Sequence, residues 1–212
     1  MPGPFVERYR GIAEALFGRP FSDKDGVPGS DLDGVPERAG YELPEALYDF
    51  YAVLGNCADV TEPHNRFYRP GGFDRRDGKL IFCEENQAVV YWGYDADQGW
   101  AADPPVYQGV NGDTLEWFVE DGRCSAFLAG MIYWQALNGG LPHSGFASAT
   151  DAVYRAAANW PLVWQDEDTQ LFSRGSAVFG LTRRESEIAV DAAGLSESDL
   201  TEVGRVLGVK LL

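Results

Sequence analysis

The sequence is poor in the residues from which metal sites and covalent cross-links are made. Among its 212 residues there are three cysteines, Cys57, Cys83 and Cys124, and two histidines. The cysteines are odd in number, and no two of them form a CxxC pair. This pattern argues against a disulfide framework and a zinc knuckle, and it is typical of reduced thiols in a cytoplasmic protein. We therefore expect a cytoplasmic location, no cofactor and no metal.

Positive charge is also scarce. The chain has 17 Lys and Arg against 33 Asp and Glu, a formal net charge of −16. Nucleic-acid binding depends on Lys and Arg that neutralise phosphates, so this balance argues against nucleic acid as a partner, and likewise against an anionic membrane surface. An acidic surface favours a basic protein partner, because complementary charge speeds encounter. In the alternative interpretation the charge only keeps the protein soluble.

Long apolar runs and the common catalytic patterns are missing as well. No stretch approaches the roughly 18 consecutive apolar residues of a transmembrane helix, and the first residues lack the basic start and apolar run of a signal peptide. We expect neither a membrane segment nor a targeting signal. The spacings GxSxG, GxGxxG, GK[ST] and HExxH do not occur. Each of these spacings is tied to a particular chemistry, so no catalytic site is predicted from a motif.

The adjacent carboxylates Glu84 and Glu85 are the strongest candidates for acid/base chemistry. Neighbours on a strand or tight turn point to opposite sides, whereas a catalytic pair must converge on one substrate. A turn in which Asn86 and Gln87 satisfy backbone groups explains these residues better. An enzyme that uses Glu84 or Glu85 with Asn86 stays as an alternative, and it requires a pocket with convergent carboxylates.

Apolar periodicity and flanking turn residues predict the secondary structure. Helical spacing predicts helices over residues 5–17, 43–54, 125–137, 152–158 and 196–207. Runs of β-branched and aromatic residues predict strands at 79–83, 88–94, 106–107, 115–120, 161–164, 171–181 and 187–190, the first two as a hairpin. Residues 22–40, rich in Asp, Gly and Pro, are expected to form an exposed, mobile loop, and 141–150 a linker.

This order of elements predicts an α+β fold. Helices flank a block of consecutive hairpin-like strands without regular strand and helix alternation, which favours a mostly antiparallel sheet with helices packed around it and covering one face. We expect a single domain with a C-terminal extension from about 150 to 212. The extension either completes the sheet or forms a separate lobe.

Aromatic and acidic residues gather in the middle of the chain. Most aromatic side chains there are expected in the core. A minority at the sheet edge, flanked by carboxylates, would form hot spots for a basic partner. The region that we predict to contact the partner consists of Tyr91, Trp92, Tyr94, Asp95, Asp97, Trp100 and Asp103. In the alternative, Tyr91 and Trp92 pack in the core and the EENQ segment only forms a turn.

Three segments of this region resemble one known family. They are the helix LPEALYDFY at 43–51, the segment FCEENQAVVYWGY at 82–94 and DPPVY at 103–107, followed by a helix rich in Phe, Leu and Trp. In this order and character they resemble the SUKH superfamily, which is named partly for a fungal regulator of cell-wall synthesis. The similarity covers about residues 38–140, and 150–212 lie outside it.

The resemblance implies a function. Bacterial members are commonly immunity proteins, which bind and neutralise the toxin domain, often a nuclease or a deaminase, that a competing cell delivers. It carries over no catalytic residue and implies a single α+β domain. We therefore expect a non-enzymatic protein that neutralises a cognate, basic toxin domain through an acidic aromatic surface. The alternative, suggested by the fungal relatives, is an intracellular scaffold or regulatory module without a toxin partner.

Overall fold

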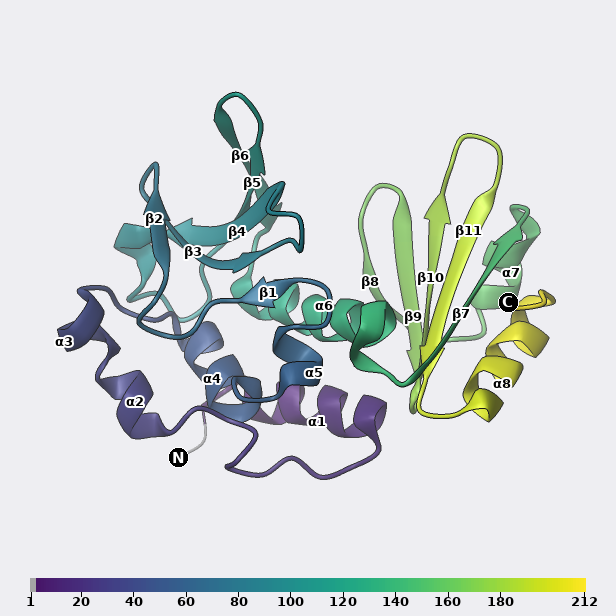
Figure 1. Cartoon of the computed structure of the whole chain (residues 1–212), viewed down its shortest axis with the longest axis horizontal. Helices are drawn as coiled ribbons and strands as arrows, with labels where there is room; N and C mark the ends of the chain where they lie inside the picture. Colours follow the sequence, from purple (N-terminus) through teal and green to yellow (C-terminus); the bar gives the residue numbers. More distant parts are fainter. Residues whose placement is uncertain (1–2) are drawn as a thin grey trace. The chain divides into compact units, whose positions relative to one another are not determined.

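A computed structural model describes residues 3–212 of the chain. Helices and two antiparallel sheets make up the structure, which confirms the predicted α+β class (Figure 1). Close contacts divide the chain into two compact units. The first comprises the chain up to Gly11 together with Phe21–Ala129, and the second comprises Ile12–Pro20 with Gly130–Leu212. Each unit is described by itself below.

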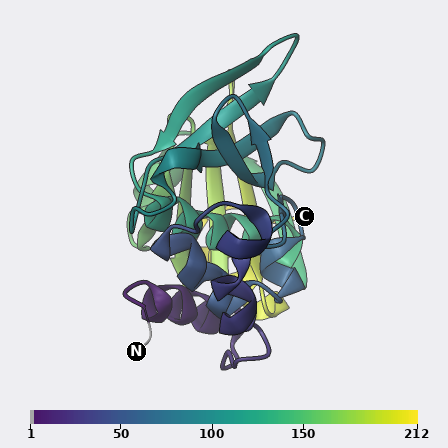
Figure 2. The same ribbon diagram turned by 90° about the vertical axis from the view of Figure 1, so that its left-hand side faces the viewer.

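The first unit is built on one antiparallel sheet. Its strand order is β1-β3-β4-β5-β6, with β2 paired to β3. The predicted hairpin of residues 79–83 and 88–94 is confirmed as β3 and β4. The hairpin of β5 and β6 extends past the neighbouring strands (Figure 2). The strand bounds are β1 Arg66–Phe67, β2 Asp74–Arg76, β3 Lys79–Glu84, β4 Val90–Asp95, β5 Val106–Asn111 and β6 Leu115–Asp121.

Helices cover one face of this sheet. Phe82 of β3 lies with its ring centroid 5.9 Å from that of Phe127, and Trp92 of β4 lies equally close to the same phenylalanine. Burying aromatic rings of this size against each other supplies much of the stability of a small core. The helices are α1 Val6–Phe17, α2 Gly29–Asp33, α3 Val35–Ala39, α4 Glu45–Leu54, α5 Ala58–Thr61 and α6 Cys124–Gln135, with a 3-10 turn η1 at Ala96–Gln98.

The segment 22–40 is not the exposed loop that its composition predicts. It contains the short helices α2 and α3, and the side chains of Leu32 and Val35 are buried. Glycine and proline are frequent enough to suggest a loop, but the two apolar side chains gain more free energy in the core than in water. That prediction is therefore wrong at these positions.

The second unit has a sheet of its own, with the order β7-β11-β10-β9-β8. Its elements are the π-helical turn η2 Ala136–Gly140, β7 His143–Ala149, α7 Ala152–Ala157, β8 Leu162–Gln165, β9 Thr169–Arg174, β10 Ala177–Arg183, β11 Ile188–Gly194 and α8 Glu197–Leu207. Residues 150–212 thus pair with β7 and do not extend the first sheet. The domain bounds at 38–140 and 150–212 stay a prediction.

Helical segments lie on both faces of this second sheet, so the expectation that helices cover one face is wrong here (Figure 1). Phe179 of β10 packs in a cluster with Val153 of α7 and Val203 of α8. On the other face, a methyl group added to Gly180 would lie 3.1 Å from the side chain of Leu137 in η2. Successive residues of a strand face opposite sides, so the sheet is enclosed between the two sets of helices.

Two sequence predictions in this unit need correction. Residues 141–150, expected as a linker, contain β7, whose small residues lack the β-branched signal of a strand but pair with β11 along its whole length. Residues 171–181, expected as one strand, form the hairpin of β9 and β10. Its turn includes Gly175 with φ at +58°, a conformation that glycine adopts without steric cost. The predicted helices at 152–158 and 196–207 are confirmed as α7 and α8.

Candidate functional site

Three aromatic residues of the predicted contact region belong to the core. Tyr91, Trp92 and Tyr94 lie on β4 and are 5%, 8% and 0% exposed. Trp92 and Tyr94 share one face of β4, where the Trp92 ring lies 5.9 Å from that of Phe127. Tyr91 lies on the opposite face, where the Arg76 guanidinium covers it at 4.7 Å from the ring centroid. The Tyr94 hydroxyl donates to the Glu42 carbonyl at 2.8 Å, and burial raises its pKa. These residues are therefore not contact residues, and the alternative core interpretation holds for them.

Two acidic residues of the region are half-buried and make internal contacts. Asp95 lies 2.7 Å from the ammonium of Lys79. Asp103 accepts a hydrogen bond from the backbone N–H of Ser125 at 2.6 Å and from the Ser125 hydroxyl at 2.7 Å. Ser125 lies in the first turn of α6, where backbone N–H groups have no partner within the helix. Asp103 thus stabilises the start of α6, and Asp95 neutralises a cation.

Asp97 and Trp100 remain as exposed members of the region. The side chain of Trp100 is 81% exposed, the largest value among the exposed large apolar residues of the described chain. Most large aromatic side chains bury the greater part of their surface in a folded protein. The exposed side chain of Trp100 is therefore available for contact with a partner protein.

The loop that carries Trp100 is held in place by backbone contacts. Ala96 donates its N–H to the Gly78 carbonyl, and Ala46 donates its N–H to the Ala102 carbonyl, each at 2.9 Å. Gly99 lies against the backbone of Glu42, since a methyl group added there would be 2.5 Å from the Glu42 carbonyl oxygen. Only glycine allows this approach. Trp100 is thus presented on an anchored loop, so that binding would cost little ordering entropy.

The contact between Gly99 and the Glu42 backbone brings a further acidic residue close to the loop that carries Trp100. Glu42 has an exposed side chain, and its backbone touches Gly99 and the Tyr94 hydroxyl. We call Glu42, Asp97 and Trp100 the Trp100 surface. Sequence reasoning missed Glu42, because it is more than fifty positions from Asp97 and no local pattern connects them. An aromatic ring flanked by carboxylates attracts Lys and Arg side chains through the face of the ring and through charge pairing.

The carboxylates considered for catalysis make separate contacts. Glu84 is buried and accepts hydrogen bonds from the Arg66 guanidinium and from the Tyr68 hydroxyl. Glu85 accepts the backbone N–H of Gln87 at 2.8 Å within the turn between β3 and β4. The two side chains therefore have different partners and do not converge. The EENQ segment forms the predicted turn, but the expectation that Asn86 and Gln87 satisfy its backbone groups is wrong for Asn86: the Glu85 side chain makes the backbone contact, and the Asn86 amide lies 3.4 Å from a ring nitrogen of His64.

The three thiols, Cys57, Cys83 and Cys124, are buried and unbonded to one another. Burial raises the pKa of the Cys83 and Cys124 thiols well above the ordinary value. A thiol needs a lowered pKa to react as a thiolate at neutral pH, so these two behave as small apolar side chains. Among residues 3–212, no group of three or more His, Cys, Asp or Glu side chains is arranged to hold a metal ion.

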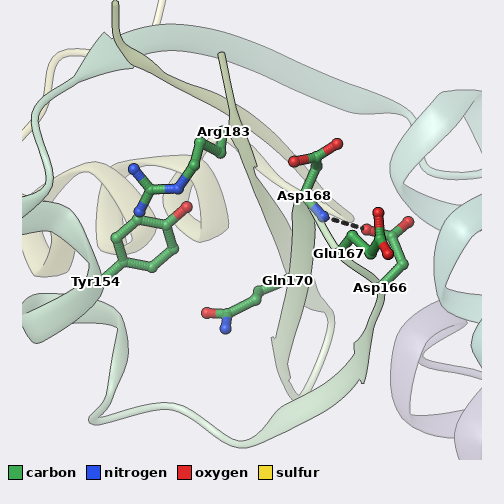
Figure 3. Close-up of a pocket in the computed structure, with 6 residues that line it drawn as sticks. All are labelled: Tyr154, Asp166, Glu167, Asp168, Gln170 and Arg183. Carbon is green, nitrogen blue, oxygen red and sulfur yellow. Dashed lines mark hydrogen bonds between the residues drawn. The ribbon is translucent and has the colours of Figure 1, made fainter. Parts of the chain in front are cut away.

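The second unit contains a hollow of about 380 Å³ beside the turn between β8 and β9 (Figure 3). Arg183 lies 5.3 Å from the ring centroid of Tyr154 and 3.1 Å from the Asp151 carboxylate. Asp166 accepts the backbone N–H groups of Asp168 and Thr169 at 2.9 and 2.7 Å. Arg183 and Asp166 thus have partners within the protein, and we assign no binding function to this hollow.

Comparison with known proteins adds no relative. No family model matches the chain, and neither a curated protein nor a solved structure matches it. The similarity to the SUKH superfamily therefore stays a prediction from the three segments described above. In the part of the chain that the structure describes, no helix is both long enough and apolar enough to span a membrane.

Proposed function

We propose that this protein is a non-enzymatic binding protein that recognises a basic partner through the Trp100 surface. The observation that supports the proposal most directly is the exposure of Trp100 on a loop held by backbone hydrogen bonds. Following the similarity to the SUKH superfamily, the partner is a toxin domain of the nuclease or deaminase class, which the protein neutralises by covering its basic surface.

The physical argument for Trp100 concerns the energetics of interfaces. Tryptophan is among the residues that contribute most to binding, and truncation of such a residue costs about 2 kcal/mol or more. That cost corresponds to a loss of affinity of about 30-fold. Because the loop is already ordered, little of the binding energy is needed to fix it. Trp100→Ala therefore should weaken partner binding without changing the fold.

The charge of the chain supports a basic partner. A net charge of −16 produces a long-range field that accelerates encounter with a basic protein, and salt screens that field. Nuclease domains are basic because they bind phosphates. An acidic inhibitor can occupy the same basic surface. We expect association to weaken as salt concentration increases.

The first experiment is capture of partners from a lysate of the source cells by the tagged full-length protein, followed by mass spectrometry at low and high salt. The variants are Trp100→Ala and Asp97→Lys. Their matched controls are Phe146→Ala, which removes an exposed aromatic ring in the second unit, and Glu62→Lys, which reverses an exposed charge in the first.

Recovery of a basic toxin domain that both controls retain and both Trp100-surface variants lose would support immunity. If the proteins lost by these variants are cellular regulators, the scaffold alternative is favoured. Capture by Trp100→Ala of the same proteins in the same amounts as the wild type would contradict the proposed surface. A large toxin gene directly upstream would add independent support for immunity.

A further inference from the structure

Strand β6 forms an open edge of the first sheet. It is the last strand in the order β1-β3-β4-β5-β6 and pairs only with β5. Asn111 donates its N–H to the Val89 carbonyl, so the odd-numbered residues of β5 direct their backbone groups toward β4. In an antiparallel ladder the direction alternates, so Gln108 and Val110 direct theirs toward β6.

The same alternation identifies the backbone groups of β6 that point outward. Phe118 and Glu116 pair with Gln108 and Val110, which leaves the N–H and C=O groups of Leu115, Trp117 and Val119 on the open side. Within residues 3–212, none of these three makes a further backbone hydrogen bond. The backbone N–H and C=O groups of these three residues are therefore available to hydrogen-bond another strand.

Exposed apolar side chains are concentrated at this edge. Eight large apolar side chains are exposed in the described part of the chain, and four of them, Val89, Val110, Phe118 and Val119, lie on or next to the β5 and β6 hairpin. Phe118 and Val119 are 52% and 65% exposed, and as neighbours on a strand they face opposite sides of the sheet. An added strand would find apolar contacts on both faces.

The other edges are short or covered. β1 has two residues, β2 three and β8 four. On the outer side of β7, Leu212 and Phe146 exchange backbone hydrogen bonds at 3.0 and 3.4 Å. Natural proteins protect long edges with proline, lysine or a covering segment, because open edges pair with other chains. β6 has seven residues and contains neither proline nor lysine; its only charged side chains are carboxylates, which discourage pairing with an acidic strand but not with a basic one (Figure 1).

The charge along β6 indicates the kind of occupant. From Gly112 to Gly122 the chain contains four acidic residues, Asp113, Glu116, Glu120 and Asp121, and no Lys or Arg. A second copy of the chain would bring like charges together, which is unfavourable for directly opposed strands. We propose that β6 binds an extended basic segment of a partner protein as an additional strand of the first sheet. None of the residues of this edge belongs to the Trp100 surface.

The test uses two pools of synthetic peptides of about nine residues, the length of a long strand. Alternate positions are Lys or Arg in the basic pool and Asp or Glu in the acidic pool, and the remaining positions are Val, Ile, Thr, Tyr or Phe. Binding to the full-length chain is measured by fluorescence anisotropy. The variant Val119→Pro removes one outward N–H, and Val119→Thr keeps that N–H and the branched shape as its matched control.

The wild type and Val119→Thr are expected to bind the basic pool and not the acidic pool. Val119→Pro should reduce binding about tenfold, the effect of losing one buried backbone hydrogen bond and the apolar contact around it. Trp100→Ala should leave binding of the pool unchanged. Failure at the Trp100 surface and failure at β6 are therefore distinguishable.

A second measurement does not depend on any variant. In the wild type, hydrogen exchange at the amides of Trp117 and Val119 should slow when the basic pool is added. Unchanged exchange, equal binding of both pools, or full binding by a folded Val119→Pro would each overturn the proposal. Self-association of the free chain that Val119→Pro abolishes would assign the edge to a second copy, and would overturn it as well.

Discussion

Replacement of Asp103 by alanine should destabilise the protein, even though sequence reasoning assigned this residue to partner binding. Its carboxylate accepts two hydrogen bonds from Ser125, one from the backbone N–H and one from the hydroxyl. Ser125 is 2% exposed, so water has little access to the two donors that lose their acceptor. The residue acts as a remote cap for α6.

The magnitude follows from the two contacts. Loss of a capping carboxylate costs about 1 kcal/mol, and a buried hydroxyl left without a partner costs about 1 to 3 kcal/mol. The two costs overlap, so we expect Asp103→Ala to lower the free energy of unfolding by about 2 to 3 kcal/mol. Asp103→Asn keeps one acceptor and should lose about half of that. Asp97→Ala removes an exposed side chain and should change stability by less than about 0.5 kcal/mol.

Equilibrium unfolding in urea, followed by far-UV circular dichroism, measures these differences. The reasoning is refuted if Asp103→Ala unfolds with the same free energy as Asp97→Ala. The comparison also decides how charge-reversal data are interpreted. A loss of partner binding in Asp103 variants reports on the folding of α6, whereas a loss in Asp97 variants reports on contact with the partner.

Two further predictions concern a close contact between a helix and a tryptophan ring, and the titration of a buried carboxyl group. Gly130→Ala should lower stability by about 1 to 3 kcal/mol in urea unfolding, because the added methyl would lie 2.2 Å from the Trp164 ring; stability equal to or above wild type would contradict this. Asp49 is 3% exposed, and its carboxylate accepts the Phe5 N–H at 3.0 Å. Burial raises the pKa of this carboxyl group, so the folded state binds a proton more tightly than the unfolded state. The protein therefore loses stability as pH rises through the folded-state pKa. Asp49→Asn should therefore be more stable than wild type at about pH 7, with a difference that shrinks toward about pH 4 in the same assay.

Much of the secondary structure could be predicted from local patterns. The N-terminal helix, the β3 and β4 hairpin and the terminal helix have strong periodicity and clear end signals. At α8, Ser196 and Asp199 form the capping box that the sequence order of Ser and an acidic residue three positions later favours. These signals act within a few residues, so they do not depend on the rest of the fold.

Local sequence patterns were less informative where contacts between distant segments determine the secondary structure or the burial of a residue. β7 consists of small residues with little strand propensity, and its pairing with β11 makes it a strand. Leu32 and Val35 lie in a segment with loop composition, and packing makes them core residues. Asp103 is 22 positions from its partner Ser125, a separation over which no sequence pattern connects the two.

The sequence by itself therefore determined the α+β class, most helices and the acidic character of the surface, because composition and periodicity are local properties. Only the tertiary structure decided which members of the aromatic and acidic region reach solvent. Trp92 is buried against Phe127 of α6, and Tyr91, on the opposite face of β4, is buried under Arg76, whereas the Trp100 side chain extends into solvent. The physical reason is that burial depends on which strands and helices pack against a residue, and those neighbours are distant in the sequence.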